Sequence, residues 1–316
     1  MIKEETIEKI SIENKKAVSR AISLVENDDK LSMELLIKIH HKTGNGYRIG
    51  ITGPPGAGKS TLTNQLTKQF RKEGKTVGII AIDPTSPFTG GALLGDRVRM
   101  SEIGSDPGVF IRSMATRGSL GGLSKKTVDA GDILDAAGYD IIIFETVGVG
   151  QSELDIAQTA DTTIVVLVPE SGDSIQAMKA GLMEIADFFV LNKSDRPGAD
   201  SAISALQTIL FMKDHNADSW MTPIVKSVAS ENIGLEEIRE SIEKHKNYLT
   251  EHDLLYKKRE KNSKLRVIDI ANNLLKRDFW NNERLEILEN EKEKIISGEI
   301  SPYLLADNLL SNYTKR

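Results

Sequence analysis

A glycine-rich stretch that ends in a lysine and two hydroxyl residues has the residue types and spacing needed to bind phosphate. Glycines let successive backbone N–H groups turn toward one anion, a lysine ammonium reaches the outer phosphates of a nucleotide, and a serine hydroxyl ligates Mg²⁺. A helical pattern over Thr61 to Glu73 follows, so the positive end of that helix also faces the anion. We predict that the nucleotide phosphates are bound by Gly53, Pro54, Pro55, Gly56, Ala57, Gly58, Lys59, Ser60 and Thr61.

Carboxylates at the ends of two predicted strands are the candidates for holding a metal ion beside this loop. Asp83 directly follows one strand, and Glu145 closes another, where an acidic residue holds Mg²⁺ directly or through water. Asp96 lies in the long glycine-rich stretch after Asp83. Asp83 and Asp96 also fit as turn or helix-cap residues. We predict metal ligands at Ser60, Asp83, Asp96 and Glu145, and a catalytic set of Lys59, Asp83, Asp96 and Glu145.

The tetrapeptide Asn192-Lys193-Ser194-Asp195 indicates which base the nucleotide carries. A carboxylate at Asp195 accepts from both N1–H and the exocyclic amine of guanine, a donor pair that adenine lacks. Asn192 is expected to brace the loop, and the stem of Lys193 is expected to cover the base face. Such a site rejects ATP, because the wrong base leaves buried polar groups unpaired. After the next strand, the backbone around Ser227, Val228 and Ala229 is expected to contact the guanine O6.

These motifs require a scaffold that brings the ends of several strands together. From residue 47 onward, apolar runs alternate with helical segments, which is typical of parallel strands covered by helices on both faces. Ligands of such doubly wound α/β folds gather at the carboxyl ends of the strands, and each motif above occupies such an end. We predict strands at Arg48–Thr52, Val77–Ile82, Val109–Ser113, Asp140–Glu145, Thr163–Val168, Phe188–Asn192 and Ile224–Ser227.

Helical segments flank this scaffold at both ends. Residues 4 to 42 predict two helices separated by the polar turn Glu26 to Lys30. Residues 251 to 297 contain no glycine or proline and carry an apolar stripe that includes Leu265 and Ile268. We favour burial of that stripe on a second copy over packing on its own domain. The predicted domains are an N-terminal helical extension (1–44), a P-loop GTPase domain (45–250) and a C-terminal helical dimerisation arm (251–316).

Composition narrows the function classes. The 316-residue chain is 39% hydrophobic and 28% charged, which suits an ordinary soluble protein with a full core. Its formal net charge of -5 argues against a broad nucleic-acid surface. The absence of cysteine excludes disulfides, thiolate nucleophiles and cysteine metal sites. We see no signal peptide and no run of membrane-spanning length, so the expected location is the cytoplasm and no membrane partner is expected.

Taken together, the motifs resemble those of one family, the methylmalonyl-CoA mutase-associated GTPases, which are metallochaperone-type P-loop proteins once described as arginine/ornithine transport kinases. The resemblance covers nearly the whole chain and is carried by GPPGAGKST, DPTSPFTGGALLGDRVRM, RGSLGGLS, ETVGVGQSE, ESGDSIQAMKAG and NKSD. It implies a homodimer joined through C-terminal helices, hydrolysis of GTP to GDP with Mg²⁺, and a complex with an adenosylcobalamin-dependent acyl-CoA mutase, whose cofactor delivery the GTPase gates.

The resemblance also bears on individual residues. Gln176 and Lys179 lie three apart on one face of a predicted helix, which alone is weak evidence, but they fall in the segment that resembles the family's additional, partner-responsive switch. Ser227-Val228-Ala229 departs from the commoner Ser-Ala at the guanine O6 loop. We expect slow GTP hydrolysis by the isolated protein, because no arginine finger is evident and a partner can complete such a site.

Two other functions remain open at this point. A P-loop kinase would use the same phosphate loop, but Asp195 as a guanine reader argues against an ATP-dependent one. A metal-insertion GTPase with its own metal store needs clustered histidine or cysteine, whereas here the five histidines are scattered along the chain.

Overall fold

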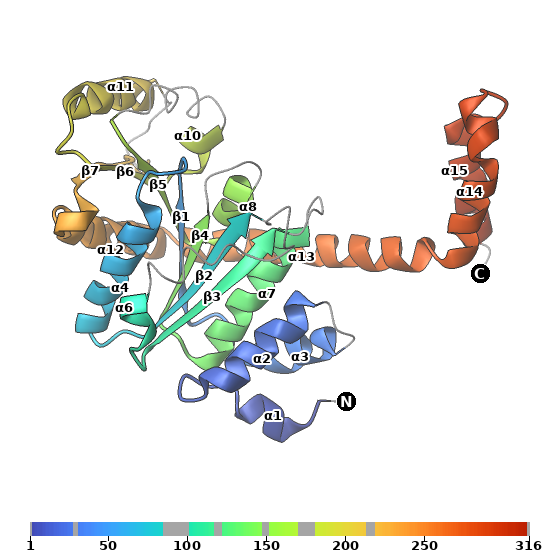
Figure 1. The fold of residues 1–316 in the computed structure, drawn as a ribbon, viewed down its shortest axis with the longest axis horizontal. Coiled ribbons are helices and arrows are strands. Elements are labelled where there is room, and N and C mark those ends of the chain that lie inside the picture. Colours follow the sequence, from blue (N-terminus) through green and yellow to red (C-terminus); the bar gives the residue numbers. More distant parts are fainter. Residues whose placement is uncertain are drawn as a thin grey trace. The chain divides into compact units, whose positions relative to one another are not determined.

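Within the residues that the computed structural model describes, the scaffold is a seven-stranded parallel sheet (Figure 1). Those residues are 2–27, 31–84, 101–116, 122–146, 152–169, 181–212 and 219–314. The strand order is β3-β2-β4-β1-β5-β6-β7. The predicted doubly wound α/β fold is therefore confirmed. The strands are β1 (Tyr47–Thr52), β2 (Val77–Pro84), β3 (Val109–Thr116), β4 (Ile141–Thr146), β5 (Thr162–Leu167), β6 (Phe188–Asn192) and β7 (Ile224–Ser227).

Strands β2 and β3 run further than predicted. The sequence Asp83-Pro84 suggests a turn, yet β2 pairs with β3 through Pro84 and Thr116. On its other side, the pairing of β2 with β4 ends at Ile82 and Thr146. Proline lacks a backbone N–H and is tolerated where a neighbouring ladder has already stopped. The extension is thus a two-strand ribbon beyond the end of β4.

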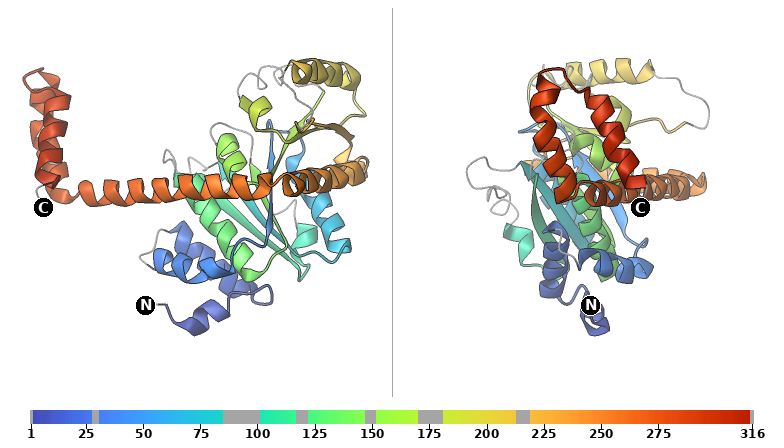
Figure 2. Two further views of the ribbon diagram at one scale, coloured as in Figure 1. Left: turned by 180° about the vertical axis from the view of Figure 1, so that it is seen from behind. Right: turned by 90° about the vertical axis from the view of Figure 1, so that its right-hand side faces the viewer.

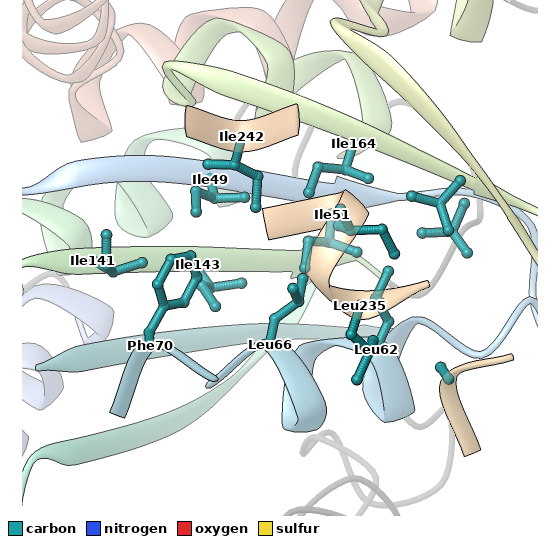
Figure 3. Packing of buried hydrophobic residues seen from close by; sticks show 14 of the residues in the cluster. Ile49, Ile51, Leu62, Leu66, Phe70, Ile141, Ile143, Ile164, Leu235 and Ile242 are labelled. Atoms are coloured by element: carbon teal, nitrogen blue, oxygen red, sulfur yellow. The ribbon is translucent and has the colours of Figure 1, made fainter. Parts of the chain in front are cut away.

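One face of the sheet packs on α4 (Lys59–Lys72), α6 (Ser101–Gly104) and α12 (Leu235–Glu251). Alternate residues of each strand point toward this face, as the two-residue period of a strand requires. Figure 3 shows the resulting core, in which strand isoleucines interleave with side chains of α4 and α12. The labelled members are Ile49, Ile51, Ile141, Ile143 and Ile164 from the strands, Leu62, Leu66 and Phe70 from α4, and Leu235 and Ile242 from α12.

The other face carries α7 (Gly122–Ala137), α8 (Ser152–Thr159) and the N-terminal helices, coloured blue beside the green α7 in Figures 1 and 2. Helix α8 packs so closely on β1 that a Cβ at Gly50 would lie 2.4 Å from Ile156 Cγ2. Further along the sheet, α10 (Met183–Ile185) and α11 (Ala199–Phe211) cover β5 and β6 through a third cluster.

The N-terminal segment contains one more break than predicted. Instead of one continuous helix before the turn, there are α1 (Glu4–Glu8) and α2 (Lys15–Glu26), followed by α3 (Ser32–Ile39) and a 3-10 turn, η1 (His40–Lys42). The Asn14 side chain accepts a hydrogen bond from the Ala17 N–H and so starts α2. Ile7 and Ile10 still reach the core that α2 and α3 share with α7. The apolar pattern was thus interpreted correctly, whereas the cap was missed.

Aspartates close the N-terminal edge of the sheet. Asp135 of α7 is buried and accepts from three successive N–H groups, those of Gly44, Asn45 and Gly46, at 2.8 to 3.1 Å. Its other neighbour is the guanidinium of Arg48, at 3.3 Å. Three further aspartates accept from N–H groups at the starts of β1, β2 and β5 in the same way, in the pairs Arg48 with Asp161, Thr76 with Asp140, and Thr163 with Asp187.

The chain divides into two compact units, Met1–Tyr256 and Lys257–Arg316. The second contains most of α13 (Leu254–Phe279), together with α14 (Asn282–Ile296) and α15 (Pro302–Thr314). Within it, Phe279 meets Tyr313 edge to face at 5.4 Å, and the guanidinium of Arg284 lies over both rings. None of the helices among the described residues combines the length and apolar character needed to cross a membrane.

Candidate nucleotide-binding site

The first corner of the site is the glycine-rich loop between β1 and α4, which is held by its own lysine. Lys59 is buried, and its Nζ donates to the carbonyl oxygens of Gly53 and Pro54 at 2.7 and 2.9 Å. Gly53 adopts φ +136°, and a Cβ there would lie 2.0 Å from the Val166 carbonyl oxygen of β5. Only glycine therefore fits at the point where the loop leaves the sheet. The loop begins pressed against β5 and folds back over the lysine.

Two side chains from the end of β6 hold the far side of the same loop. Asn192 Nδ2 donates to the Ala57 carbonyl at 2.8 Å, and Lys193 Nζ donates to the Gly56 carbonyl at 2.9 Å. The amide of Asn192 lies so close that a Cβ at Gly58 would be 2.3 Å from Nδ2. Because the peptide bond is planar and trans, the Gly58 N–H points away from the carbonyl that Asn192 holds. The contact of Asn192 with the Ala57 carbonyl thus turns the Gly58 N–H toward the opposite side, where an anion can bind, whereas the Ala57 N–H donates to the Pro54 carbonyl at 3.2 Å.

The second corner of the site joins the loop to β4. Ser60 Oγ donates to Glu145 Oε1 at 2.5 Å, and the Glu145 side chain is buried. The sheet register explains the proximity, because Glu145 lies directly opposite Ile51, two residues before the loop. One position further along, Thr146 Oγ1 donates to Thr52 Oγ1 at 2.9 Å, and both threonines are buried. The end of β4 is therefore joined by one hydroxyl contact to the first turn of α4 and by another to the end of β1.

The third corner is formed by the ends of β6 and β7. Asn192 Oδ1 accepts from Ser227 Oγ at 3.2 Å and from the Ala229 N–H at 3.0 Å. Ala229 opens a short 3-10 turn, η3 (Ala229–Glu231). The Val228 N–H donates to the Ile233 carbonyl. Asn192 thus links the glycine-rich loop between β1 and α4, which is the predicted phosphate loop, to the loop after β7. The N–H groups of Val228 and Ala229 both donate hydrogen bonds within the protein.

Each predicted site residue that the structure describes lies on one of these three corners. The residues from Gly53 to Thr61, Glu145, the Asn192–Asp195 segment and the Ser227–Ala229 segment come together at the carboxyl edge of the sheet, as β1, β4, β6 and β7 end there. Asp195 is exposed. The side chain of Asp83, and Asp96, Gln176 and Lys179 as a whole, lie outside the described residues. Their roles remain predictions.

Three residues at the site had not been singled out as functional. The Thr52 and Thr146 hydroxyls meet because β1 pairs with β4, and Ser194 Oγ donates to the Ser227 carbonyl because β6 pairs with β7. Thr146 could have been noticed as the residue after Glu145. Lys193 reaches the Gly56 carbonyl of the glycine-rich loop with its Nζ, and the expectation that its stem covers the base stays a prediction.

Hard oxygen ligands are present where a magnesium ion is expected. Ser60 and Glu145 supply a hydroxyl and a carboxylate in contact, and Mg²⁺ favours oxygen ligands while keeping several waters. Among the described residues, there is no cluster of three or more His, Cys, Asp or Glu side chains suited to a metal. Further ligands would come from water, from nucleotide phosphates or from residues outside the described set. This donor set fits magnesium bound together with a nucleotide.

Comparison with known proteins places this chain in a family. A family model described as "Methylmalonyl Co-A mutase-associated GTPase MeaB" matches residues 18–284. The chain is 48% identical over 309 residues to a putative GTPase of Pyrococcus abyssi, covering 97% of this chain and 95% of that protein. It is 33% identical over 278 residues to "Methylmalonic aciduria type A homolog, mitochondrial" of Mus musculus, covering 85% and 66%.

A solved structure supports the same assignment. The crystal structure described as LAO/AO transport system kinase superposes with a TM-score of 0.74 at 28% identity and covers 100% of both chains. That match spans both compact units and the family model spans all three corners of the site. The chain therefore belongs to the family of methylmalonyl-CoA mutase-associated GTPases, MeaB.

Proposed function

We propose that this protein binds GTP with Mg²⁺, hydrolyses it to GDP, and uses that cycle to assist an adenosylcobalamin-dependent acyl-CoA mutase. Methylmalonyl-CoA mutase is the favoured client. In this proposal the GTPase gates adenosylcobalamin loading and protects or reactivates the mutase. The observation that carries the nucleotide part is the double contact of Asn192, which joins the phosphate loop at Ala57 to the predicted base loop at Ala229. The family assignment carries the mutase part.

We assign each of these residues a role, from its contacts where the structure describes it and from the sequence motifs elsewhere. Lys59 is already buried beside the loop and needs only to exchange its two carbonyl contacts for phosphate oxygens. Ser60 and Glu145 would hold Mg²⁺, which neutralises charge developing on the transferred phosphoryl group. Asp195 would accept from guanine N1–H and the 2-amino group. Asp83 and Asp96 would serve the metal and water region, and Gln176 and Lys179 the partner-responsive switch.

Activation by the partner is part of the proposal. Catalysis of phosphoryl transfer is mainly positioning and electrostatic stabilisation, and a missing positive charge supplied by a partner accelerates it by several orders of magnitude. We expect the isolated protein to turn over slowly and the mutase complex to turn over faster. We propose that this cycle takes place in the cytoplasm.

The first experiment separates guanine from adenine. Binding of GDP and ADP to the purified protein with Mg²⁺ is measured by calorimetry, and the Asp195→Ala variant serves as the matched comparison. We expect strong preference for GDP in the native protein and loss of that preference in the variant. Equal binding of ADP would instead support the P-loop kinase alternative.

The second experiment tests the client. The protein is mixed with methylmalonyl-CoA mutase apoenzyme, and adenosylcobalamin loading is followed by the cofactor's absorbance with GTP or with a non-hydrolysable analogue. We expect loading to depend on the nucleotide state and GTP turnover to rise with mutase concentration. Identical loading in all nucleotide states, with turnover unaffected by the mutase, would reject the chaperone role and leave a GTPase of another client, including a metal-insertion client.

We further propose that the three predicted domains have separate roles. Residues 251–316 act as a dimerisation arm, residues 45–250 as the GTPase domain, and residues 1–44 as its N-terminal helical extension. Helix α13 exposes a series of large apolar side chains. Burial of these side chains against a second copy of the chain would stabilise a homodimer. These include Leu265, Val267, Ile268 and Leu275, each at least 46% exposed. Light scattering of Ile268→Glu/Leu275→Glu should show a monomer with the GDP affinity of the native protein, and a dimer in that variant would place the interface elsewhere.

A further inference from the structure

The third corner of the site, at the ends of β6 and β7, contains one polar side chain for which the Asn192–Asp195 tetrapeptide predicts no role. Ser194 occupies the variable position between Lys193 and Asp195. Its Oγ donates to the Ser227 carbonyl at 3.1 Å, and its own N–H donates to the same oxygen at 3.0 Å. A carbonyl oxygen has two lone pairs, so both bonds are accommodated together. Ser194 is therefore attached to the end of β7 by two donors.

This attachment stands at the last step of the sheet. Asn192 pairs with Ser227 in the final register position of β6 and β7, so the Ser194 N–H makes the bond that ends the ladder. Immediately before it, Lys193 adopts φ +56°, a left-handed conformation that is costly for a residue with a Cβ. Such a backbone persists only where its neighbours fix it. Asn192 fixes it on one side through Ala57 and Ala229, and Ser194 fixes it on the other.

Asp195 lies directly beyond this point, at the tip of a turn. The Arg196 N–H donates to the Lys193 carbonyl at 3.1 Å, which closes a four-residue turn with Ser194 and Asp195 at its centre. Asp195 itself is exposed, whereas Ser194 is partly buried. The direction in which the Asp195 carboxylate points is thus set by the plane of a turn whose anchored residue is Ser194.

We propose that Ser194 is a positioning residue for base recognition, whose hydroxyl holds the turn on β7 so that Asp195 meets the guanine 2-amino group and N1–H. The inference rests on the proposed GTP-binding function and adds a residue that sets its specificity. Removal of the hydroxyl leaves the backbone bond to Ser227 but lets the turn rotate about it. The phosphate loop is held by Asn192, Lys193 and Lys59, and these contacts do not involve the Ser194 side chain.

The test compares GDP with IDP, which keeps the same phosphates and O6 but lacks the 2-amino group. One hydrogen bond to a charged acceptor gives the native protein a GDP preference of about tenfold or more. In Ser194→Ala the ratio of the GDP and IDP affinities should fall by about three- to tenfold, and IDP binding should weaken less than GDP binding, because IDP loses only the N1–H contact to Asp195. Ser194→Thr keeps the hydroxyl and should keep the native ratio.

The outcomes separate this inference from the proposed function. Equal weakening of GDP and IDP in Ser194→Ala would mean a general structural role and would overturn it, as would an unchanged ratio. Thermal unfolding of the ligand-free variants checks that the fold persists. Asp195→Ala supplies the limit in which the 2-amino contact is absent, and the GDP/IDP ratio of Ser194→Ala should lie between that limit and the native value. If the native protein itself does not prefer GDP over ADP, the proposed function fails first.

Discussion

The two edges of the sheet use opposite halves of the peptide group. At the N-terminal edge, aspartates accept from main-chain N–H groups before or at the start of the strands, as Asp135 does for residues 44 to 46. At the carboxyl edge, Lys59, Asn192, Lys193 and Ser194 donate to main-chain carbonyls. One edge thus supplies its own anions to the N–H groups, whereas at the other edge side-chain donors hold carbonyls, and the Asn192 contact turns the Gly58 N–H toward the proposed phosphate site. The same kind of contact stabilises the fold at one edge and shapes the proposed ligand site at the other.

The largest effect should follow from removing the lysine at the carboxyl edge. Lys59→Ala should weaken GTP binding by about 4 kcal/mol, roughly a thousandfold, because a buried charge partner of the phosphates is lost. Calorimetric titration measures this. Lys72→Ala, on the same helix but exposed, is the control and should bind like the native protein. Similar affinities for the two variants would remove Lys59 from the phosphate site.

The reverse pattern should follow at the other edge. Asp135→Asn should lower the free energy of unfolding by about 3 kcal/mol, because the Arg48 guanidinium and three N–H groups lose a buried carboxylate. GTP affinity should stay within twofold. Urea unfolding and nucleotide titration of the same preparation measure both quantities. A large loss of affinity in the folded variant would show that the two edges are coupled.

A change of the residue that reads the base should test whether the third corner binds guanine. Asp195→Asn should weaken GTP binding by about 2 kcal/mol, roughly 30-fold, and improve binding of xanthosine triphosphate, since the amide donor matches the 2-carbonyl of xanthine. Competition titration with both nucleotides measures the exchange. An unchanged GTP affinity would move the base pocket away from Asp195.

The smallest effect concerns pH. Asp106 accepts from Arg71 and from the Gly108 N–H before β3, and the Arg71 guanidinium holds the pKa of Asp106 below its usual value, although partial burial opposes this. A carboxyl with a lowered folded-state pKa stabilises the fold above its unfolded value, and this contribution is lost as the pH falls through the folded pKa. Asp106→Asn should therefore cost less than about 1 kcal/mol at pH 7, and the difference from the native protein should shrink on acidification below about pH 4. Urea midpoints at several pH values measure it.

The sequence was informative where the pattern is local. Continuous apolar runs predicted all seven strands, and the spacing of glycine, lysine and the Asn192–Asp195 tetrapeptide predicted which strand ends carry the nucleotide motifs. The contacts between those ends were not predictable in the same way. Thr52 meets Thr146, and Ser194 meets Ser227, only because of strand order and register, which pair residues 94 and 33 positions apart. The cap at Asn14 was local but was hidden within an apolar pattern that continued across it.

The close approach of Asn192 to Gly58 ties the fate of two distant positions together. A methyl group at residue 58 would occupy the place of the Asn192 amide, and the φ of +91° at Gly58 strains any residue with a Cβ, so Gly58→Ala should be poorly tolerated even if residue 192 becomes smaller. The same shortening would release the Ala57 carbonyl and the Ala229 N–H at once. A substitution at either position therefore disturbs the contacts on which the proposed nucleotide site depends, so each of the two residues restricts which side chains the other can carry.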